Sequence, residues 1–183
     1  MSGPDAPLFV GQPPLRTLAD TEALWNGLKD GTIDLLATDL ATWTRAQKMD
    51  STLTLSRLRP GVSNLQVMLP MYFSEGVGKR GFSLERFATT TSTNAARIFG
   101  LYPKKGALRV GSDADVVIWD PRKSDSVRGE DDLSKADYSV NEGWKATGWP
   151  VLTIRRGEVL LENGRVVGQA GSGTLVTRQR WSH

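Results

Sequence analysis

One acidic side chain, Asp39, is a candidate functional residue because of its position in the sequence. It directly follows residues 32–38, a short apolar run bounded by turn residues that predicts a buried strand. A carboxylate at the carboxyl end of such a strand can ligate a metal ion or act as a general base. The same pattern also fits an ordinary turn or a helix N-cap, so the residues alone leave both interpretations open.

The histidine and cysteine counts exclude several kinds of catalytic and metal site. The only histidine is His183, the last residue, and the chain has no cysteine. A Ser-His-Asp triad and a site of several histidines are therefore excluded within this chain. The absence of cysteine excludes disulfides, thiolate zinc sites and cysteine nucleophiles, and it favours a cytoplasmic location.

Composition is that of a soluble globular protein. The 183 residues are 39% hydrophobic and 23% charged, and 23 Lys and Arg against 20 Asp and Glu give a net charge of +3. Because the basic residues are scattered rather than clustered, we expect no nucleic-acid partner. No apolar run approaches the roughly 20 residues of a membrane-spanning helix, so we expect no membrane association.

The first half of the chain predicts helices around that one strand. A helix begins near Asp20, which we expect as its N-cap, and ends at Gly31. The long, aperiodic connection over residues 40–62 is of the kind that is often functional. Further helices are predicted over residues 64–76, 83–88 and 92–100.

After Pro103 the pattern becomes that of short strands. Residues 107–110 and 114–119 predict a hairpin, and residues 121–148 are polar with little periodicity. Asn163-Gly164, between alternating runs, is a strong hairpin signal, and Arg156-Gly157 marks a second turn. Strands are predicted over residues 151–155, 158–161 and 165–167.

These elements predict an α/β part over residues 1–105 followed by a β part over residues 106–183. The order of a helix, a buried strand, an acid at the end of that strand, a long loop and further helices is typical of one βα unit of a (β/α)8 barrel. In such barrels the chemistry lies at the carboxyl ends of the strands.

Several blocks of sequence strengthen that interpretation through a family resemblance. Pro13-Pro14-Leu15-Arg16, Leu36-Ala37-Thr38-Asp39, residues 92–106 and residues 111–121 agree with one family in order and spacing. They closely resemble the cyclic amidohydrolases, the family of dihydropyrimidinase and D-hydantoinase, with allantoinase and dihydroorotase as relatives. The resemblance implies the C-terminal part of a TIM barrel, its last strand and helices, followed by a small composite β-sandwich lobe and tail.

The resemblance also implies an activity. Family members hydrolyse the C–N bond of cyclic imides or amides such as hydantoins and dihydropyrimidines, using two divalent ions that are usually zinc. The family's last-strand aspartate, here Asp39, contacts a metal and carries a proton from the attacking hydroxide to the leaving nitrogen. A carboxylate beside a divalent ion stays ionised and can accept that proton.

Two departures bear on the substrate. The family often has histidine after the aspartate, and this chain has Leu40. Its substrate loop commonly has Pro-Asn-Gly, where this chain has Arg59-Pro60-Gly61. Proline has no backbone N–H, so a ring contact would use the Pro60 carbonyl or a neighbour such as Gly61. Trp43 is a further candidate for lining the ligand pocket.

The implied ligand set is incomplete in this chain. A barrel of this kind takes about 250 residues, and the family's histidines and bridging carboxylated lysine lie upstream of the part that this chain resembles. Asp39 alone cannot hold a catalytic ion, which takes about three protein ligands. We therefore expect a partner, either a missing N-terminal half or a homo-oligomer. The alternatives are a non-catalytic scaffold module or an inactive truncated product.

Three charged segments carry competing interpretations. Ser112-Asp113-Ala114-Asp115 could bind a metal or form a turn that enters a strand, and the turn is favoured. Lys104-Lys105 could bind phosphate or form a solvated loop, and the loop is favoured. The tail residues Arg178, Arg180 and Trp181 could contact nucleic acid or, as the family suggests, a neighbouring subunit.

Overall fold

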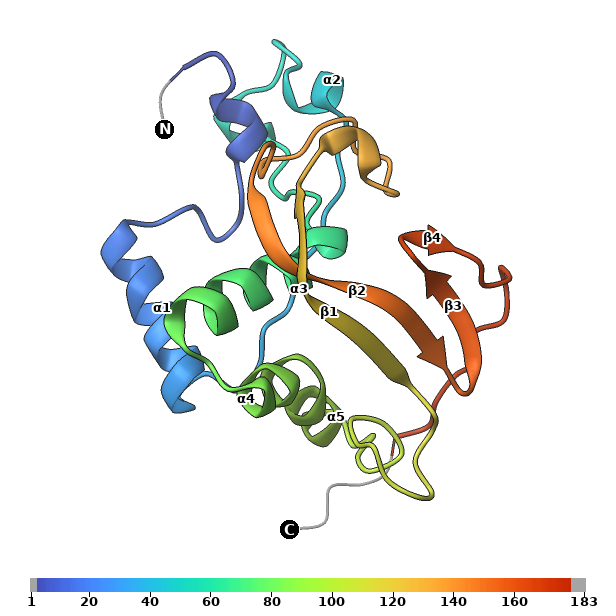
Figure 1. The fold of residues 1–183 in the computed structure, drawn as a ribbon. Coiled ribbons are helices and arrows are strands. Elements are labelled where there is room, and N and C mark those ends of the chain that lie inside the picture. The colour runs from blue at the N-terminus through green and yellow to red at the C-terminus, as the bar shows by residue number, and fades with distance from the viewer. Residues whose placement is uncertain (1–2, 179–183) are drawn as a thin grey trace.

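The computed structural model describes residues 3–178, with helices in the first half and one antiparallel sheet in the second (Figure 1). The first helix, α1, covers Leu18–Asp30 and ends at Gly31, whose φ of 100° is left-handed. Its N-cap is Thr17: the Thr17 hydroxyl accepts from the backbone N–H of Asp20, whose carboxylate accepts from the Thr17 N–H. The expectation that Asp20 is the N-cap is wrong: Asp20 is the third residue of the helix, and its side chain completes the capping box with Thr17.

Residues 32–38 form no strand, contrary to the sequence-based expectation. They are held by contacts with helical segments, in which Leu36 N–H donates to Thr90 O at 3.1 Å and Asn94 Nδ2 donates to Asp34 O at 2.8 Å. A strand exists only as part of a hydrogen-bonded ladder. Within residues 3–178 the four strands pair only with one another, so this segment has no strand beside it.

Short helical turns interrupt the long connection of residues 40–62. They are α2 (Arg45–Lys48) and the 3-10 turn η2 (Leu55–Arg57). Another 3-10 turn, η1 (Ala6–Phe9), lies near the N-terminus, outside this connection. The N-cap of α2 is Thr44, which forms a second capping box with Gln47. The connection is therefore locally ordered, although its sequence has no helical period.

Two longer helical stretches follow. The first is α3 (Leu65–Tyr72), which continues as a π-helical turn over Phe73–Lys79. The second is α4 (Leu84–Ala88), joined to α5 (Asn94–Ile98) by a π-helical turn over Thr89–Thr93. The helices expected in this part of the sequence are confirmed, and the last two are one continuous stretch.

The sheet contains four strands in the order β1-β2-β3-β4, all antiparallel. The predicted turns are confirmed: Arg156 and Asn163 have φ values of 51° and 49°, and each is followed by a glycine of positive φ. Such paired left-handed residues match the twist of a two-residue hairpin. The strands are β1 (Val116–Ser126), β2 (Lys145–Arg155), β3 (Glu158–Glu162) and β4 (Arg165–Val166).

The start of the sheet differs from the expectation. Residues 107–110 form no strand, so the predicted hairpin with residues 114–119 is wrong. Instead β1 pairs with β2, and both strands extend into the polar segment 121–148 through a register shift between Asp120 and Ser124. Residues 3–178 contain a single sheet, so the expected sandwich is not formed within them.

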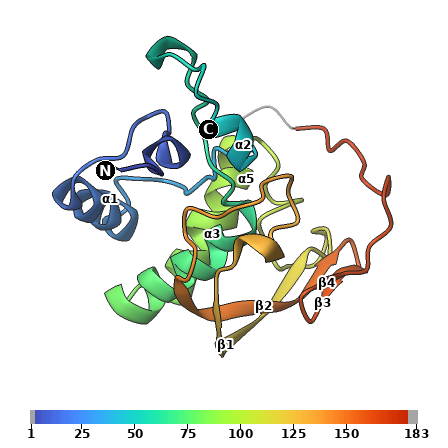
Figure 2. The same ribbon diagram turned by 90° about the horizontal axis from the view of Figure 1, so that it is seen from above.

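Aromatic side chains join the helices to the sheet. One cluster of buried residues consists of Leu28, Tyr72 and Phe82, and the ring of Trp25 stacks on that of Tyr72 with 5.6 Å between the ring centres. Trp119 on β1 lies 5.2 Å from the ring of Phe73, which carries the packing into the sheet. As Figures 1 and 2 show, α3 lies between α1 and the strands β3 and β4. No helix among the described residues has the length and apolar character needed to cross a membrane.

Phe82→Ala tests this core. Phe82 is 5% exposed and packs edge-on against Trp25 and Tyr72. Its truncation leaves a cavity, so we expect the free energy of unfolding to fall by about 3–5 kcal/mol in urea denaturation. Leu55→Ala is the control, because Leu55 is 88% exposed and its loss is expected to cost less than about 0.5 kcal/mol. Equal effects of the two substitutions would contradict this placement of the core.

Candidate functional site

Asp39 has a left-handed backbone and lies in a segment without regular structure, here called the Asp39 turn. Its φ is 45°, a conformation that aspartate tolerates better than most residues, and its side chain is exposed. The residue before it is anchored, because Asn64 Nδ2 donates to the carbonyl of Thr38 at 3.0 Å. The turn therefore holds the Asp39 backbone while leaving its carboxylate accessible.

Gly61 brings the far end of the long connection back to this turn. A Cβ on Gly61 would lie 3.1 Å from the carbonyl oxygen of Ala41 and would overlap the Ala41 Cβ. Gly61 also has a φ of 111°, which disfavours any other residue. Ala41 is two residues after Asp39, so the two ends of the connection meet at the candidate catalytic residue.

Trp43 holds Pro60 by a hydrogen bond. The indole Nε1–H donates to the Pro60 carbonyl at 2.9 Å, and the guanidinium of Arg59 lies 5.5 Å from the centre of the Trp43 ring. The N–H of Gly61 donates to the carbonyl of Val10 at 3.0 Å. The structure thus brings three of the sequence-predicted site residues, Trp43, Pro60 and Gly61, into one cluster beside the Asp39 turn.

Lys48 completes this cluster and was missed by the sequence analysis. It is 2% exposed, and its ammonium group donates to the carbonyls of Gly61 at 2.6 Å, Leu8 at 2.9 Å and Val10 at 3.0 Å. Burial lowers the pKa of the Lys48 ammonium. No local signal marks a lysine in an aperiodic polar segment as buried, since its burial depends on contacts with residues 38 to 40 positions earlier.

The connection between β1 and β2 supports the cluster from outside. The hydroxyl of Ser63 donates to Asp132 Oδ2 at 2.6 Å, and the backbone N–H of Arg45 donates to Asp137 Oδ1 at 2.6 Å. Figure 1 shows this connection lying against the segment around α2. The second half of the chain therefore helps to position the loop that carries the candidate residues.

The donors of the described residues do not make a complete metal site. Within residues 3–178, no group of three or more His, Cys, Asp or Glu side chains could hold an ion. A catalytic divalent ion takes about three protein ligands, and the position after Asp39 is Leu40. Asp39 is thus one candidate ligand, and a full set needs donors from elsewhere.

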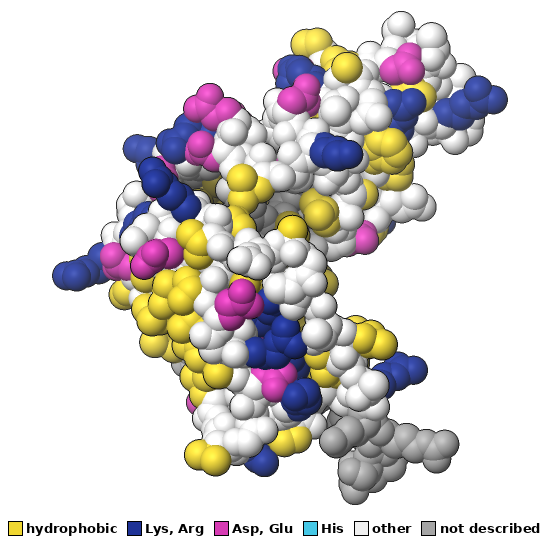
Figure 3. Space-filling model, turned by 90° about the vertical axis from the view of Figure 1, so that its right-hand side faces the viewer, with side chains coloured by type: hydrophobic (Ala, Val, Ile, Leu, Met, Phe, Trp, Pro, Cys, Tyr) yellow, Lys and Arg dark blue, Asp and Glu magenta, His cyan; other side chains and the backbone are white. Residues whose placement is uncertain are grey.

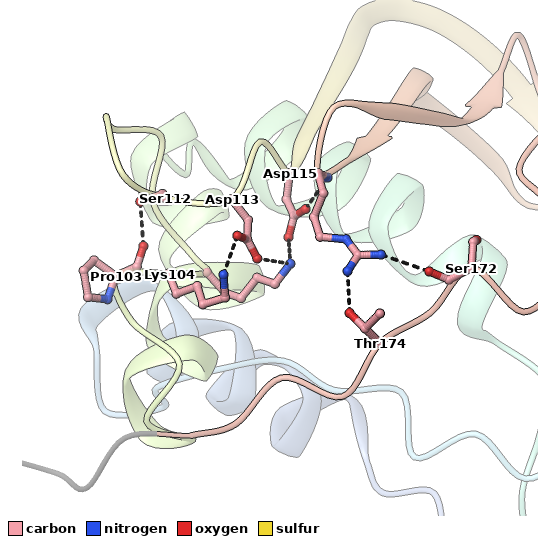
Figure 4. Close-up of polar contacts among 9 residues, drawn as sticks. Pro103, Lys104, Ser112, Asp113, Asp115, Ser172 and Thr174 are labelled. Atoms are coloured by element: carbon pink, nitrogen blue, oxygen red, sulfur yellow. Dashed lines mark hydrogen bonds and ion pairs between the residues drawn. The ribbon is translucent and has the colours of Figure 1, made fainter.

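The acidic cluster at Asp113 and Asp115 forms ion pairs. Asp113 contacts the ammonium groups of Lys104 at 2.7 Å and Lys105 at 2.9 Å (Figure 4). Asp115 pairs with Lys105 and accepts from the backbone N–H of Arg156 at 2.9 Å. The favoured interpretation of this segment, a turn that enters a strand, is confirmed.

Surface charge is mixed on the face in Figure 3, where basic and acidic side chains lie side by side. Of the tail residues singled out in the sequence, Arg178 is exposed, whereas Arg180, Trp181 and His183 lie outside the described residues.

Gly61→Ala tests the contact with Ala41. Gly157→Ala is the matched control, because Gly157 has a φ of 84° and open space around its Cα. Both substitutions place a Cβ on a residue with positive φ, which lowers the free energy of unfolding by about 1 kcal/mol or more. Gly61→Ala is expected to lower the free energy of unfolding by about 1–3 kcal/mol beyond that, through steric overlap. Equal losses in thermal or urea unfolding would show that the two ends of the connection do not touch.

Asp113→Asn tests the ion pairs. Lys104 and Lys105 hold the pKa of Asp113 below its ordinary value of 3.8. The pairing therefore stabilises the fold above that pH, and its contribution is lost as the pH falls through the lower, native pKa. We expect Asp113→Asn to reduce stability at pH 7, with the difference from the wild type shrinking below pH 3.8. Asp34→Asn, at an exposed acid, is the control; a difference that did not depend on pH would contradict the pairing.

The chain matches one protein family over most of its length. A model of the amidohydrolase family matches residues 15–160. The chain is 41% identical over 176 residues to a D-phenylhydantoinase of Escherichia coli O1:K1, covering 96% of this chain and 38% of the relative. The expected resemblance to cyclic amidohydrolases is confirmed.

Solved structures agree with the sequence comparison. A D-hydantoinase (dihydropyrimidinase) from a Thermus species matches with a TM-score of 0.92 at 32% identity, over 96% of this chain and 38% of the other. A dihydropyrimidinase from Brevibacillus agri matches with a TM-score of 0.89 at 31% identity, over 97% of this chain and 39% of the other. The chain thus spans about two fifths of the length of these relatives, and it belongs to the amidohydrolase family.

Proposed function

We propose that this chain contributes part of the active site of a hydantoinase-type hydrolase, which opens cyclic imides or amides at a C–N bond. The observation that carries this proposal is the cluster in which Pro60, Gly61 and Trp43 meet the Asp39 turn. Family membership supplies the reaction class. The remaining ligands come from the upstream part of the family's barrel, which carries the histidines that this sequence lacks.

In this proposal the fold is one part of a larger barrel. Residues 32–38, whose backbone hydrogen bonds here go to helical segments and to Asn64, become its last strand once the other strands of the barrel lie beside them. The sheet of β1–β4 becomes one layer of a composite β-sandwich in the same way. Both steps supply backbone partners that residues 3–178 do not contain.

Asp39 is the proposed proton carrier. A divalent ion, which we propose is zinc, would polarise the ring carbonyl and favour attack by water. The Asp39 carboxylate takes a proton from the attacking water and delivers it to the ring nitrogen as the C–N bond breaks. Its exposure in a turn of fixed backbone suits a group that must reach both atoms.

Pro60 and its neighbours are the proposed ring-binding residues. The Pro60 carbonyl already accepts from Trp43, and a carbonyl oxygen has two lone pairs, so it can accept a second bond from a ring N–H. The Gly61 N–H is committed to Val10, so it is not the donor for a ring carbonyl. Trp43 then orients the acceptor and lines one side of the pocket.

The incomplete set of metal ligands favours a second candidate. A chain with one candidate ligand can act as a non-catalytic scaffold module of an amidohydrolase assembly, or be an inactive truncated product. Unlike the hydrolase proposal, both alternatives predict that no activity of the assembly depends on Asp39.

Asp39→Asn separates the candidates. The chain is combined with a polypeptide that carries the missing strands and histidines, and hydantoin ring opening is followed by absorbance. We expect Asp39→Asn to lower kcat by a factor of about 100 or more, because a positioned proton carrier is lost. Asp34→Asn, a nearby exposed acid, is expected to leave kcat unchanged. A complex that forms but never hydrolyses the ring would exclude the hydrolase proposal. A complex that stays fully active after the Asp39→Asn substitution would exclude the proton-carrying role of Asp39 and favour the scaffold module.

A further inference from the structure

Lys48 is a buried cation held by backbone carbonyls. Its side chain is 2% exposed, and within residues 3–178 its ammonium group forms no ion pair with a carboxylate. The three donors of the ammonium group are matched by three carbonyl acceptors, those of Leu8, Val10 and Gly61. Without these bonds the buried charge would be strongly unfavourable, so the arrangement specifies a lysine.

The three acceptors come from two segments far apart in the sequence. Leu8 and Val10 lie at the end of η1, and Gly61 lies at the far end of the long connection. The Val10 carbonyl also accepts the N–H of Gly61 at 3.0 Å, so both backbone polar groups of Gly61 are fixed at this point. The lysine is itself oriented by the capping box of Thr44 and Gln47 at the start of α2.

We propose that Lys48 is a positioning residue: its ammonium group fixes the Pro60–Gly61 backbone beside Asp39 so that the Pro60 carbonyl faces the ring of the cyclic amide. This inference deepens the proposed function and depends on it for the identity of the ligand. Lys48 does not touch the ligand. It acts through Gly61, whereas Trp43 acts directly on the Pro60 carbonyl.

Substitutions at this position differ in the donors they retain. Lys48→Ala leaves three carbonyls around an empty space, which a primary alkylammonium ion such as n-propylammonium can fill. Tetramethylammonium has the same charge but no N–H donor. Lys48→Arg retains the charge, yet its planar guanidinium does not converge on three carbonyls as an ammonium does.

The first measurement is hydrogen–deuterium exchange of the 183-residue chain. We expect Lys48→Ala to accelerate exchange at Gly61 about tenfold or more, to leave β2 unchanged, and to be reversed by n-propylammonium but not by tetramethylammonium. Lys29→Ala is the matched control, because Lys29 also donates to a backbone carbonyl, that of Arg80, at 2.8 Å. If Lys48→Ala unfolds the chain, Lys48→Arg is used and is expected to accelerate exchange at Gly61 with β2 still protected.

The second measurement is steady-state kinetics of the reconstituted enzyme. We expect Lys48→Arg to raise KM about tenfold with kcat changed by less than about twofold, since a lost positioning contact weakens ring binding. Unchanged exchange at Gly61, no rescue by n-propylammonium, or an unchanged KM in an active complex would each overturn the role of Lys48. An inactive wild-type complex overturns the proposed function instead, so the two failures are distinct.

Discussion

The close approach of Gly61 to Ala41 is the constraint on which the candidate site depends. The long connection leaves at Asp39 and returns at Gly61, and no side chain fits between the two ends. Polar bonds then hold them in place: Asn64 to Thr38, Trp43 to Pro60, and Lys48 to Gly61. Each acceptor is a backbone carbonyl, so the bonds fix the path of the chain and leave the Asp39 carboxylate free.

The rest of the molecule supports this contact between the two ends of the connection from two sides. The aromatic core around Tyr72 and Phe82 holds the helices, and Thr90, anchored in that core, accepts the N–H of Leu36 just before the Asp39 turn. From the other side, the connection between β1 and β2 reaches Ser63 through Asp132. The two halves of the chain therefore share the task of placing one loop.

Features with local causes could be predicted from the sequence. The hairpin turn at Asn163-Gly164 follows from two residues that tolerate positive φ, and the helix end at Gly31 follows from one.

Features that depend on contacts with distant parts of the chain could not be predicted from the sequence. Residues 32–38 have the composition of a strand, but a strand needs a partner. Likewise β1 extends into polar sequence because β2 lies beside it. Pro60 and Gly61 were candidates through the family resemblance and Trp43 through its place in the loop after Asp39, but no sequence signal indicated that Trp43 contacts Pro60. The burial of Lys48 had no sequence signal either.

The chain belongs to the amidohydrolase family and matches hydantoinases over about two fifths of their length. The central claim is that Asp39 belongs to a metal site completed by strands and histidines that this sequence does not contain. Native mass spectrometry and metal analysis of the protein, isolated from its own host, test this most directly. We predict that this chain is found together with a histidine-bearing segment, in one polypeptide or in a complex of fixed ratio, and with a divalent metal. A chain that is isolated alone and binds no metal would contradict the claim.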